Sequence, residues 1–194
     1  MKFKFVILCA ALLAISAGAA NAASNWVGGG VGAGVPTGDY GNAATTGWQI
    51  GATGTHVMNE QWGLGADLGY HMWNGSSDAN AAAEAAFGVG SEWKWSAIQA
   101  TAHAMYMLPT SGSMAPYLKG GLGFYGITGK LKSPGGDVSD TQNKLGYNIG
   151  AGMNFASTGS THWGVVAQYH IVPIQSQNVD FMTFGLNMMW GVGK

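Results

Sequence analysis

Apolar and polar residues alternate along most of the chain from Asn25 onward, and clusters of turn-forming residues divide this part into eight segments. A period of two places successive side chains on opposite faces of a β-strand. The alternation therefore predicts eight strands, at residues 25–35, 47–58, 62–73, 93–108, 116–130, 144–156, 162–173 and 181–192.

The two faces of each predicted strand differ in the same way. In the third strand the large apolar residues share one face, and the other face carries Gly63, Gly65, Asp67, Gly69 and His71. In the last strand, Leu186 and its apolar neighbours lie opposite Thr183, Gly185 and Asn187. The polar face holds mostly Gly, Asn, Thr and Gln, whereas surfaces in bulk water are rich in charge. We therefore expect the polar face to line a narrow lumen.

Aromatic residues on the apolar face gather near the strand ends, in the pairs Trp62 and Tyr70, Tyr147 and Phe155, Trp163 and Tyr169, and Phe184 and Trp190. This spacing corresponds to roughly 15 to 20 Å along the barrel axis. Membrane barrels carry aromatic girdles on both sides of an apolar band about 25 Å tall. The apolar face is therefore predicted to contact lipid.

Glycine is abundant on the polar face, as at Gly28, Gly30, Gly32, Gly34, Gly121 and Gly123. A barrel of eight strands encloses little more than side-chain volume, so these glycines are expected to leave room inside it. The alternative is that they mark bends or a flexible segment.

The connections between the predicted strands differ in length. Residues 58–61, 109–115 and 157–161 are short, whereas the other connections are longer and hold most of the charge. This arrangement is typical of outer-membrane barrels, which have short periplasmic turns and long extracellular loops. The alanine-rich segment 78–87 predicts either a short helix capped by Asp78 or a mobile loop.

The N-terminus has the pattern of a secretory signal peptide. Lys2 and Lys4 precede an apolar run over 5–17, which is followed by the small-residue pattern of 20–22. We expect cleavage after Ala22, so that 1–22 is a signal peptide and 23–194 is an outer-membrane β-barrel domain. Cys9 would leave with the signal peptide, which removes disulfides and thiol chemistry from the mature protein.

The net charge of the mature chain excludes one class of partner. All eight basic residues are lysines, and loss of two with the signal leaves a net charge of −3. Nucleic acid is therefore not an expected partner. No stretch of 18 or more apolar residues follows the signal, and a closed barrel is the other structure that crosses a membrane. The predicted fold is all-β, an eight-stranded antiparallel up-and-down transmembrane β-barrel.

Two sequence motifs carry a family resemblance. The stretch Gly-Val-Pro-Thr-Gly-Asp-Tyr-Gly at 34–41, before Gly-Trp-Gln-Ile-Gly at 47–51, resembles the opening of small outer-membrane barrels of the OmpA, OmpX and OmpW type. Gly185, Met188 and Trp190 resemble the family's C-terminal assembly signal, although the chain continues to Lys194. The resemblance implies a cell outer-membrane location, contact with outer-membrane lipid, and recognition of the last strand by the barrel-assembly machinery. We also expect a monomer.

Candidate chemistry is sparse. Asp67 and Lys119 fall on the polar faces of strands three and five, which predicts an ion pair inside the lumen across strand four, with His103 as the nearest alternative partner. The five histidines are not expected to converge, and no metal-binding spacing is present. No cofactor, metal or catalytic residue is predicted, and the protein is expected not to be an enzyme.

Three functions remain open at this point. The first is a non-enzymatic structural or surface-interaction barrel. The second is a conduit for small apolar molecules, as OmpW-type barrels are thought to be, for which Met105, Met107, Tyr125 and Val166 supply some apolar lumen surface. The third is a barrel enzyme that modifies lipid A with His, Ser and a carboxylate, but no serine is predicted beside Asp67 and His71.

Overall fold

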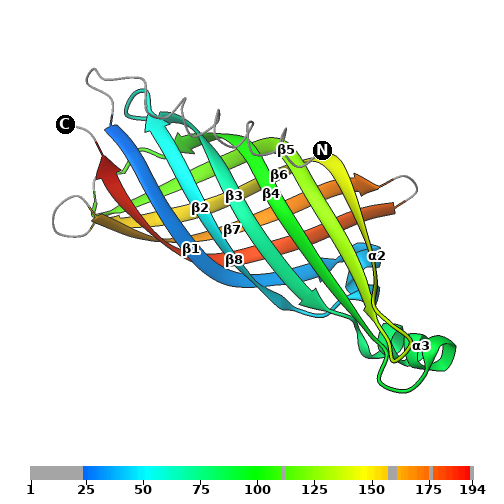
Figure 1. Ribbon diagram of the computed structural model, residues 1–194. Coiled ribbons are helices and arrows are strands. Elements are labelled where there is room, and N and C mark those ends of the chain that lie inside the picture. Colours follow the sequence, from blue (N-terminus) through cyan, green and yellow to red (C-terminus); the bar gives the residue numbers. More distant parts are fainter. Residues whose placement is uncertain (1–23, 111, 157–160, 175–176, 193–194) are drawn as a thin grey trace.

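The computed structural model describes residues 24–110, 112–156, 161–174 and 177–192 (Figure 1). Within these residues each antiparallel strand pairs with the next, and the last pairs with the first, so the sheet closes into a barrel. The strands are β1 (Ser24–Thr37), β2 (Gly47–Val57), β3 (Trp62–Asn74), β4 (Glu92–Met107), β5 (Met114–Lys132), β6 (Val138–Ala156), β7 (Thr161–Ile174) and β8 (Gln177–Val192). The predicted fold class is confirmed. The predicted signal peptide, 1–22, lies outside the described residues.

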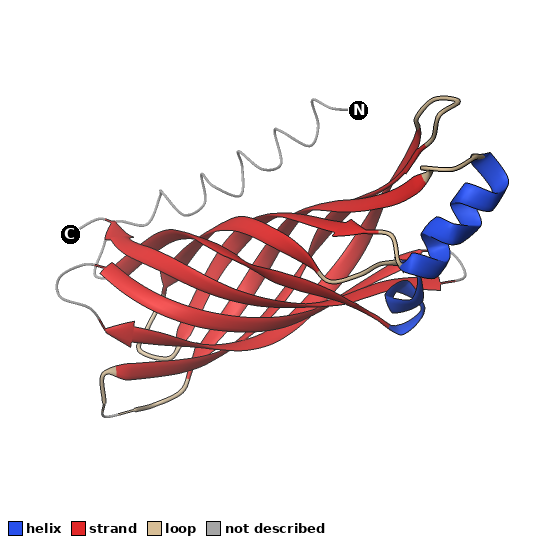
Figure 2. Ribbon diagram, turned by 90° about the horizontal axis from the view of Figure 1, so that it is seen from below, coloured by secondary structure: helices blue, strands red, loops and turns tan. Residues whose placement is uncertain are grey.

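Two helices accompany the barrel, α2 (Gly38–Ala43) and α3 (Ser77–Phe87). Figures 1 and 2 place both helices and the β5–β6 hairpin at the same end of the barrel, which we call the helical end. The opposite end is called the short-turn end. Among the described residues, neither helix is long and apolar enough to cross a membrane.

The prediction of segment 78–87 is half right. A helix forms there, but its N-cap is Ser76, whose Oγ accepts a hydrogen bond from the Ala79 N–H at 3.2 Å. Asp78 lies in the first turn instead, where a carboxylate also stabilises the helix dipole. The helix ends at Gly88, whose φ of 103° is readily reached only without a side chain.

Two connections expected to be long are short. Strand β6 begins at Val138 rather than at 144, and β8 begins at Gln177 rather than at 181. The predicted strands begin only where the apolar alternation begins, which is later in the chain than the observed strand starts. Backbone pairing does not depend on that alternation, because a strand that leaves the apolar band carries polar residues on both faces.

The outer wall of the barrel is apolar, as predicted. Leu186 and Ile149 are 62% and 67% exposed, whereas Asp67 on the opposite face is 9% exposed. Aromatic pairs contact each other at both levels of the wall, with ring centroids of Trp62 and Tyr106 4.9 Å apart and those of Trp48 and Tyr70 5.7 Å apart. Such a surface, an apolar band with aromatic girdles on both sides, is the one that membrane barrels present to hydrocarbon.

The apolar wall ends at a defined level on three neighbouring strands. Ser96 of β4 pairs with Thr128 of β5, which pairs with Thr141 of β6, and the two threonine hydroxyls are 2.8 Å apart. Beyond this row the outer face carries the ion pairs Lys94–Glu92 at 3.2 Å, Lys132–Glu92 at 3.3 Å and Lys130–Asp137 at 2.7 Å. Strands β4 to β6 therefore continue outside the hydrocarbon at the helical end.

This extension is not closed. Strand β6 pairs with β7 from Tyr147 onward, so its earlier part, from Val138 to Gly146, pairs with β5 alone among the described residues. In Figure 1 the β5–β6 hairpin reaches toward α3. The inner face of the extension is thus open to one side.

The glycines of the polar face make room inside the lumen, as predicted, and some also allow close strand approach, which was not predicted. A Cβ at Gly34 or Gly121 would first meet the side chain of Trp73 or Asn148, so these glycines make room for lumen side chains, whereas one at Gly28 would meet the backbone of Met188 and then the side chain of Met189. At Gly30, Gly32 and Gly123 the first atoms met belong to the backbone of the neighbouring strand. Those three glycines allow the close strand approach that a strongly coiled, narrow barrel requires.

Candidate functional site

The lumen charges lie together in the middle of the barrel. Lys119 Nζ of β5 lies 2.7 Å from Asp67 Oδ1 of β3, across β4 as expected. His103 Nδ1 of β4 lies 3.0 Å from Asp67 Oδ2, and its Nε2 lies 3.1 Å from the Thr55 hydroxyl. His103 therefore bonds the carboxylate itself and is not an alternative partner of Lys119.

These four residues form one buried polar cluster, which we call the lumen cluster: Thr55, Asp67, His103 and Lys119. All are 9% exposed or less. An isolated charge would be costly in this position, but both carboxylate oxygens have a partner. Hydrogen bonds to an ionised group are shorter and stronger than neutral ones, so the cluster ties β2, β3, β4 and β5 together.

Above the lumen cluster, toward the helical end, aromatic rings fill the barrel. The rings of His71, Trp73, Tyr125, His170 and Phe181 contact one another, and we call this group the aromatic plug. Phe181 stacks on His170 with centroids 4.5 Å apart and packs edge-on against Trp73 at 4.9 Å. The five residues are at most 1% exposed.

The prediction that the histidines do not converge is wrong for His71 and His170. Their ring centroids are 5.6 Å apart. The error arises because β3 and β7 are distant in sequence and face each other only across the closed barrel. The other partners of these rings are neutral: His71 Nε2 donates to Gln99 Oε1 at 3.1 Å, and His170 Nδ1 lies 3.0 Å from the Tyr125 hydroxyl. Among the described residues no group of three or more His, Cys, Asp or Glu is placed to hold a metal.

Glycines also shape the plug and the cluster. A Cβ at Gly146 would lie 2.8 Å from the Tyr125 ring, and one at Gly65 would lie 2.6 Å from His103 Nε2. The large lumen rings thus occupy the space that these glycines leave.

Little free volume remains inside the barrel. A cavity of about 80 Å³ borders Asp67 and Lys119, and one of about 140 Å³ at the short-turn end is lined mainly by apolar residues such as Met105 and Met189. The aromatic plug lies between these cavities and the helical end.

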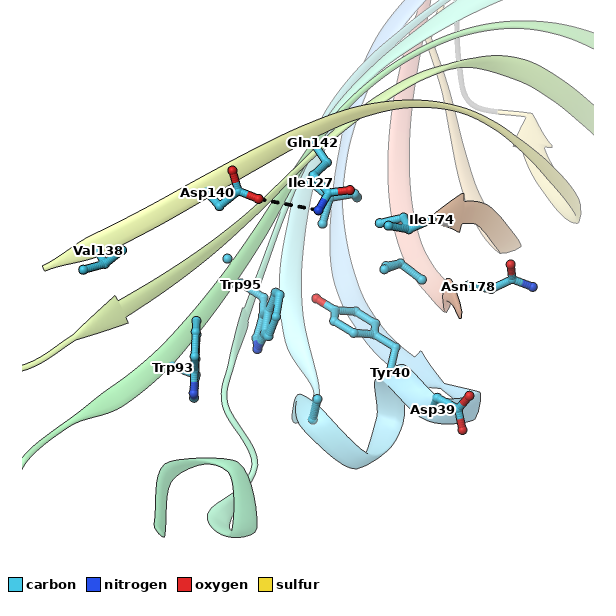
Figure 3. A pocket seen from close by; sticks show the side chains of 13 residues that line it. Asp39, Tyr40, Trp93, Trp95, Ile127, Val138, Asp140, Gln142, Ile174 and Asn178 are labelled. Atoms are coloured by element: carbon cyan, nitrogen blue, oxygen red, sulfur yellow. Dashed lines mark hydrogen bonds between the residues drawn. The ribbon is translucent and has the colours of Figure 1, made fainter. Parts of the chain in front are cut away.

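A larger pocket of about 450 Å³ opens above the plug, on the inner face of the extension, and we call it the vestibule (Figure 3). Its aromatic walls are Trp93 and Trp95 of β4 and Tyr40 of α2, and apolar residues such as Ile127 and Ile174 complete the lining. Its polar lining residues are Asp39, Asp140, Gln142 and Asn178.

The aromatic walls of the vestibule are packed against each other. The Trp93 and Trp95 rings stack with centroids 5.6 Å apart and an interplanar angle of 17°. Tyr40 meets Trp95 edge-on at 5.8 Å and Trp73 of the plug at 5.6 Å. Burial raises the pKa of the Tyr40 phenol far above its ordinary value, so the hydroxyl keeps its proton.

Comparison with known proteins decides the family. The sequence profile of the outer membrane protein β-barrel domain matches residues 7–191. The chain belongs to this family. It is accordingly an outer-membrane β-barrel protein.

Solved structures of outer-membrane barrels share the fold. Neisserial surface protein A is 16% identical, with a TM-score of 0.62 over 89% of this chain and 100% of that one. OprG from Pseudomonas aeruginosa is 14% identical, with a TM-score of 0.54 over 89% and 97%. Ail of Yersinia pestis, solved with the heparin analogue sucrose octasulfate, is 16% identical, with a TM-score of 0.51 over 88% and 97%. The comparison with curated proteins gives no match.

Sequence reasoning about this outer-membrane barrel missed the vestibule. Trp93 and Trp95 are visible as a same-face pair at the start of a strand, but Tyr40 lies in a helix that was not predicted. The contact of Thr55 with His103 was also missed, because the level of Thr55 along the lumen depends on the register between β2 and β3. Both omissions concern contacts between elements that are separated in sequence.

Proposed function

We propose that this outer-membrane barrel is a non-enzymatic and non-conducting monomer that acts at the cell surface through its helical end. The observation that carries the proposal is the aromatic plug, which closes the lumen below the vestibule. The turns of the short-turn end would face the periplasm, as in other barrels of this architecture.

The closed lumen argues against a conduit for small molecules. A path along the axis would have to displace rings that are packed against one another. A lateral path would need a gap between strands. The lipid-facing wall has an open hollow of about 780 Å³ around Leu118, Ala151 and Ala167, but β5, β6, β7 and β8 remain paired through it.

An enzyme remains the second candidate because of one observation. Thr55, His103 and Asp67 are hydrogen bonded in the order of a nucleophile, a base and an acid. Two features favour a structural role instead. The Thr55 side chain is buried at 2% exposure, and Lys119 engages the same carboxylate, which weakens its support for a histidinium ion.

Conductance across planar lipid bilayers tests the closed lumen. We expect no steady channel current from the wild-type protein, and ion-permeable steps from the double variant Trp73→Ala, Phe181→Ala. The matched control is Trp48→Ala, which removes an indole from the lipid-facing wall and should stay silent. Regular open-channel steps from the wild-type protein would contradict the proposal.

Mass spectrometry of lipid A tests the absence of catalysis. Outer membranes that contain the wild-type protein, the Thr55→Val variant or an empty vector should give the same lipid A species. A modification that appears with the wild-type protein and disappears with Thr55→Val would assign the lumen cluster to catalysis and overturn the non-enzymatic proposal.

Export can be tested in the same membranes. The signal pattern of 1–22 supports cleavage, and N-terminal sequencing of the extracted protein should begin at Ala23. A mature protein that retains the apolar run over 5–17 would show that this segment is not a cleaved signal.

A further inference from the structure

We propose that the vestibule is a binding site for a neutral saccharide, a mono- or disaccharide ring system presented outside the cell. This inference rests on the proposed function, because it requires the helical end to face the exterior. It adds the site and the chemical class of the ligand.

The size and position of the vestibule fit a ligand site. Its volume of about 450 Å³ lies within the range of small-molecule pockets, which runs from roughly 300 to 1,000 Å³. It lies beyond the polar row of Ser96, Thr128 and Thr141, so a ligand would reach it from water. The aromatic plug closes the base of the vestibule, so a ligand can bind there but cannot pass into the lumen.

The aromatic walls fit the apolar faces of a sugar ring. The C–H bonds of a pyranose carry partial positive charge on the ring face, and an aromatic face carries partial negative charge. Trp93 and Trp95 stand side by side from one strand in Figure 3, and Tyr40 faces them from α2. A flat ring can therefore stack on indole in a pocket that is also lined by Ile127 and Ile174.

The polar groups of the vestibule fit sugar hydroxyls. Asp39 and Asp140 accept hydrogen bonds, and Gln142 and Asn178 both donate and accept. Gln142 Nε2 and Asp140 Oδ2 are 3.5 Å apart, a weak contact that a ligand can replace (Figure 3).

The charge of the lining selects against other ligands. Two carboxylates and no lysine line the vestibule within the described residues, which disfavours a sulfated or phosphorylated glycan. A simple ammonium ion would suit the carboxylates and the aromatic rings. It offers no acceptor, however, so the amide donors of Gln142 and Asn178 would find no partner on it. A neutral sugar supplies donors, acceptors and an apolar face together.

The experiment measures binding of four neutral disaccharides, maltose, cellobiose, lactose and chitobiose, to the full mature protein in phospholipid nanodiscs. Nanodiscs avoid the sugar headgroups of common detergents. Saturation-transfer NMR and tryptophan fluorescence should show saturable binding of at least one disaccharide. Failure of all four disaccharides to bind overturns the inference.

Variants locate the site. Trp93→Ala and Asp140→Asn should each weaken binding at least about tenfold, the equivalent of 1.4 kcal/mol. Asp140 is exposed, so its variant should fold normally. Trp48→Phe is the matched control, because Trp48 lies on the lipid-facing wall, and its binding should equal that of the wild type. Binding that neither vestibule variant changes would place the sugar elsewhere and refute the site.

Two further probes test the ligand class. Sucrose octasulfate and choline should not compete with the bound disaccharide. Competition by either one would assign the vestibule to an anionic or a cationic ligand and refute the neutral class. These results are independent of channel current and of lipid A composition, so the saccharide inference can fail while the proposed function stands.

Discussion

The lumen and the vestibule lie on the same inner face of one sheet, yet they are filled in opposite ways. In the lumen, Asp67 and Lys119 satisfy each other, the rings of the plug pack on each other, and the cavities measure about 80 and 140 Å³. In the vestibule, a space of about 450 Å³ remains beside aromatic rings and exposed carboxylates. Closure of the sheet leaves an interior with little free volume, whereas the same face beyond closure keeps an open pocket that a ligand can enter.

The largest expected effect comes from breaking the lumen cluster. Asp67→Asn leaves Lys119 buried without a counter-charge, which should lower the free energy of unfolding by about 3 to 5 kcal/mol. The double variant Asp67→Asn, Lys119→Met should recover much of that loss. Urea unfolding in phospholipid vesicles, followed by tryptophan fluorescence, measures both. An unchanged midpoint for Asp67→Asn would mean that the ion pair contributes nothing to stability.

A somewhat smaller effect is expected at the lipid-facing wall. Leu186→Arg places a charge in hydrocarbon and should destabilise the barrel by about 2 to 4 kcal/mol in bilayers. The neighbouring Asn187 faces the lumen, so Asn187→Lys is the matched control, and its cost should depend little on bilayer thickness. Equal dependence of both variants on bilayer thickness would contradict the assigned faces.

A substitution at the helical end should destabilise α3 without lowering the stability of the barrel. Ser76→Ala removes the N-cap of α3, which typically costs about 1 kcal/mol of helix stability. We expect faster proteolysis within 77–90 and no shift in the urea midpoint of the barrel. A shift of that midpoint would show that α3 folds as part of the barrel.

The smallest effect concerns the ion pairs outside the apolar band. Hydrogen bonds from Lys94 and, secondarily, Lys132 hold the pKa of Glu92 below its ordinary value of 4.5. Because the folded pKa is lowered, these contacts stabilise the extension above the unfolded pKa and are lost as the pH falls through the folded one. An NMR titration of the Glu92 carboxyl should give a pKa below 4.5, and Lys94→Gln should raise it. A Glu92 pKa that Lys94→Gln leaves unchanged would contradict this contact.

The sequence was sufficient for the fold because strand number and face polarity appear as local alternation, and because a sheet that crosses a membrane must be closed. The pair Asp67 and Lys119 could be placed from strand faces and hairpin register. The contact of His71 with His170 could not, because it depends on the curvature that brings β3 opposite β7. The vestibule was hidden for a related reason: its strands continue through polar residues such as Ser139 and Thr141, where the alternation ends.

The open side of β6 has a consequence for self-association. A closed barrel has no strand edge, but among the described residues the backbone groups from Val138 to Gly146 form one at the helical end. Exposed edges can template the addition of a strand from another chain, and charged residues on them oppose this. Asp140 and Lys144 lie within this edge. Resistance of this edge to strand addition thus depends on these two charges, much as the stability of the barrel in lipid depends on its apolar wall.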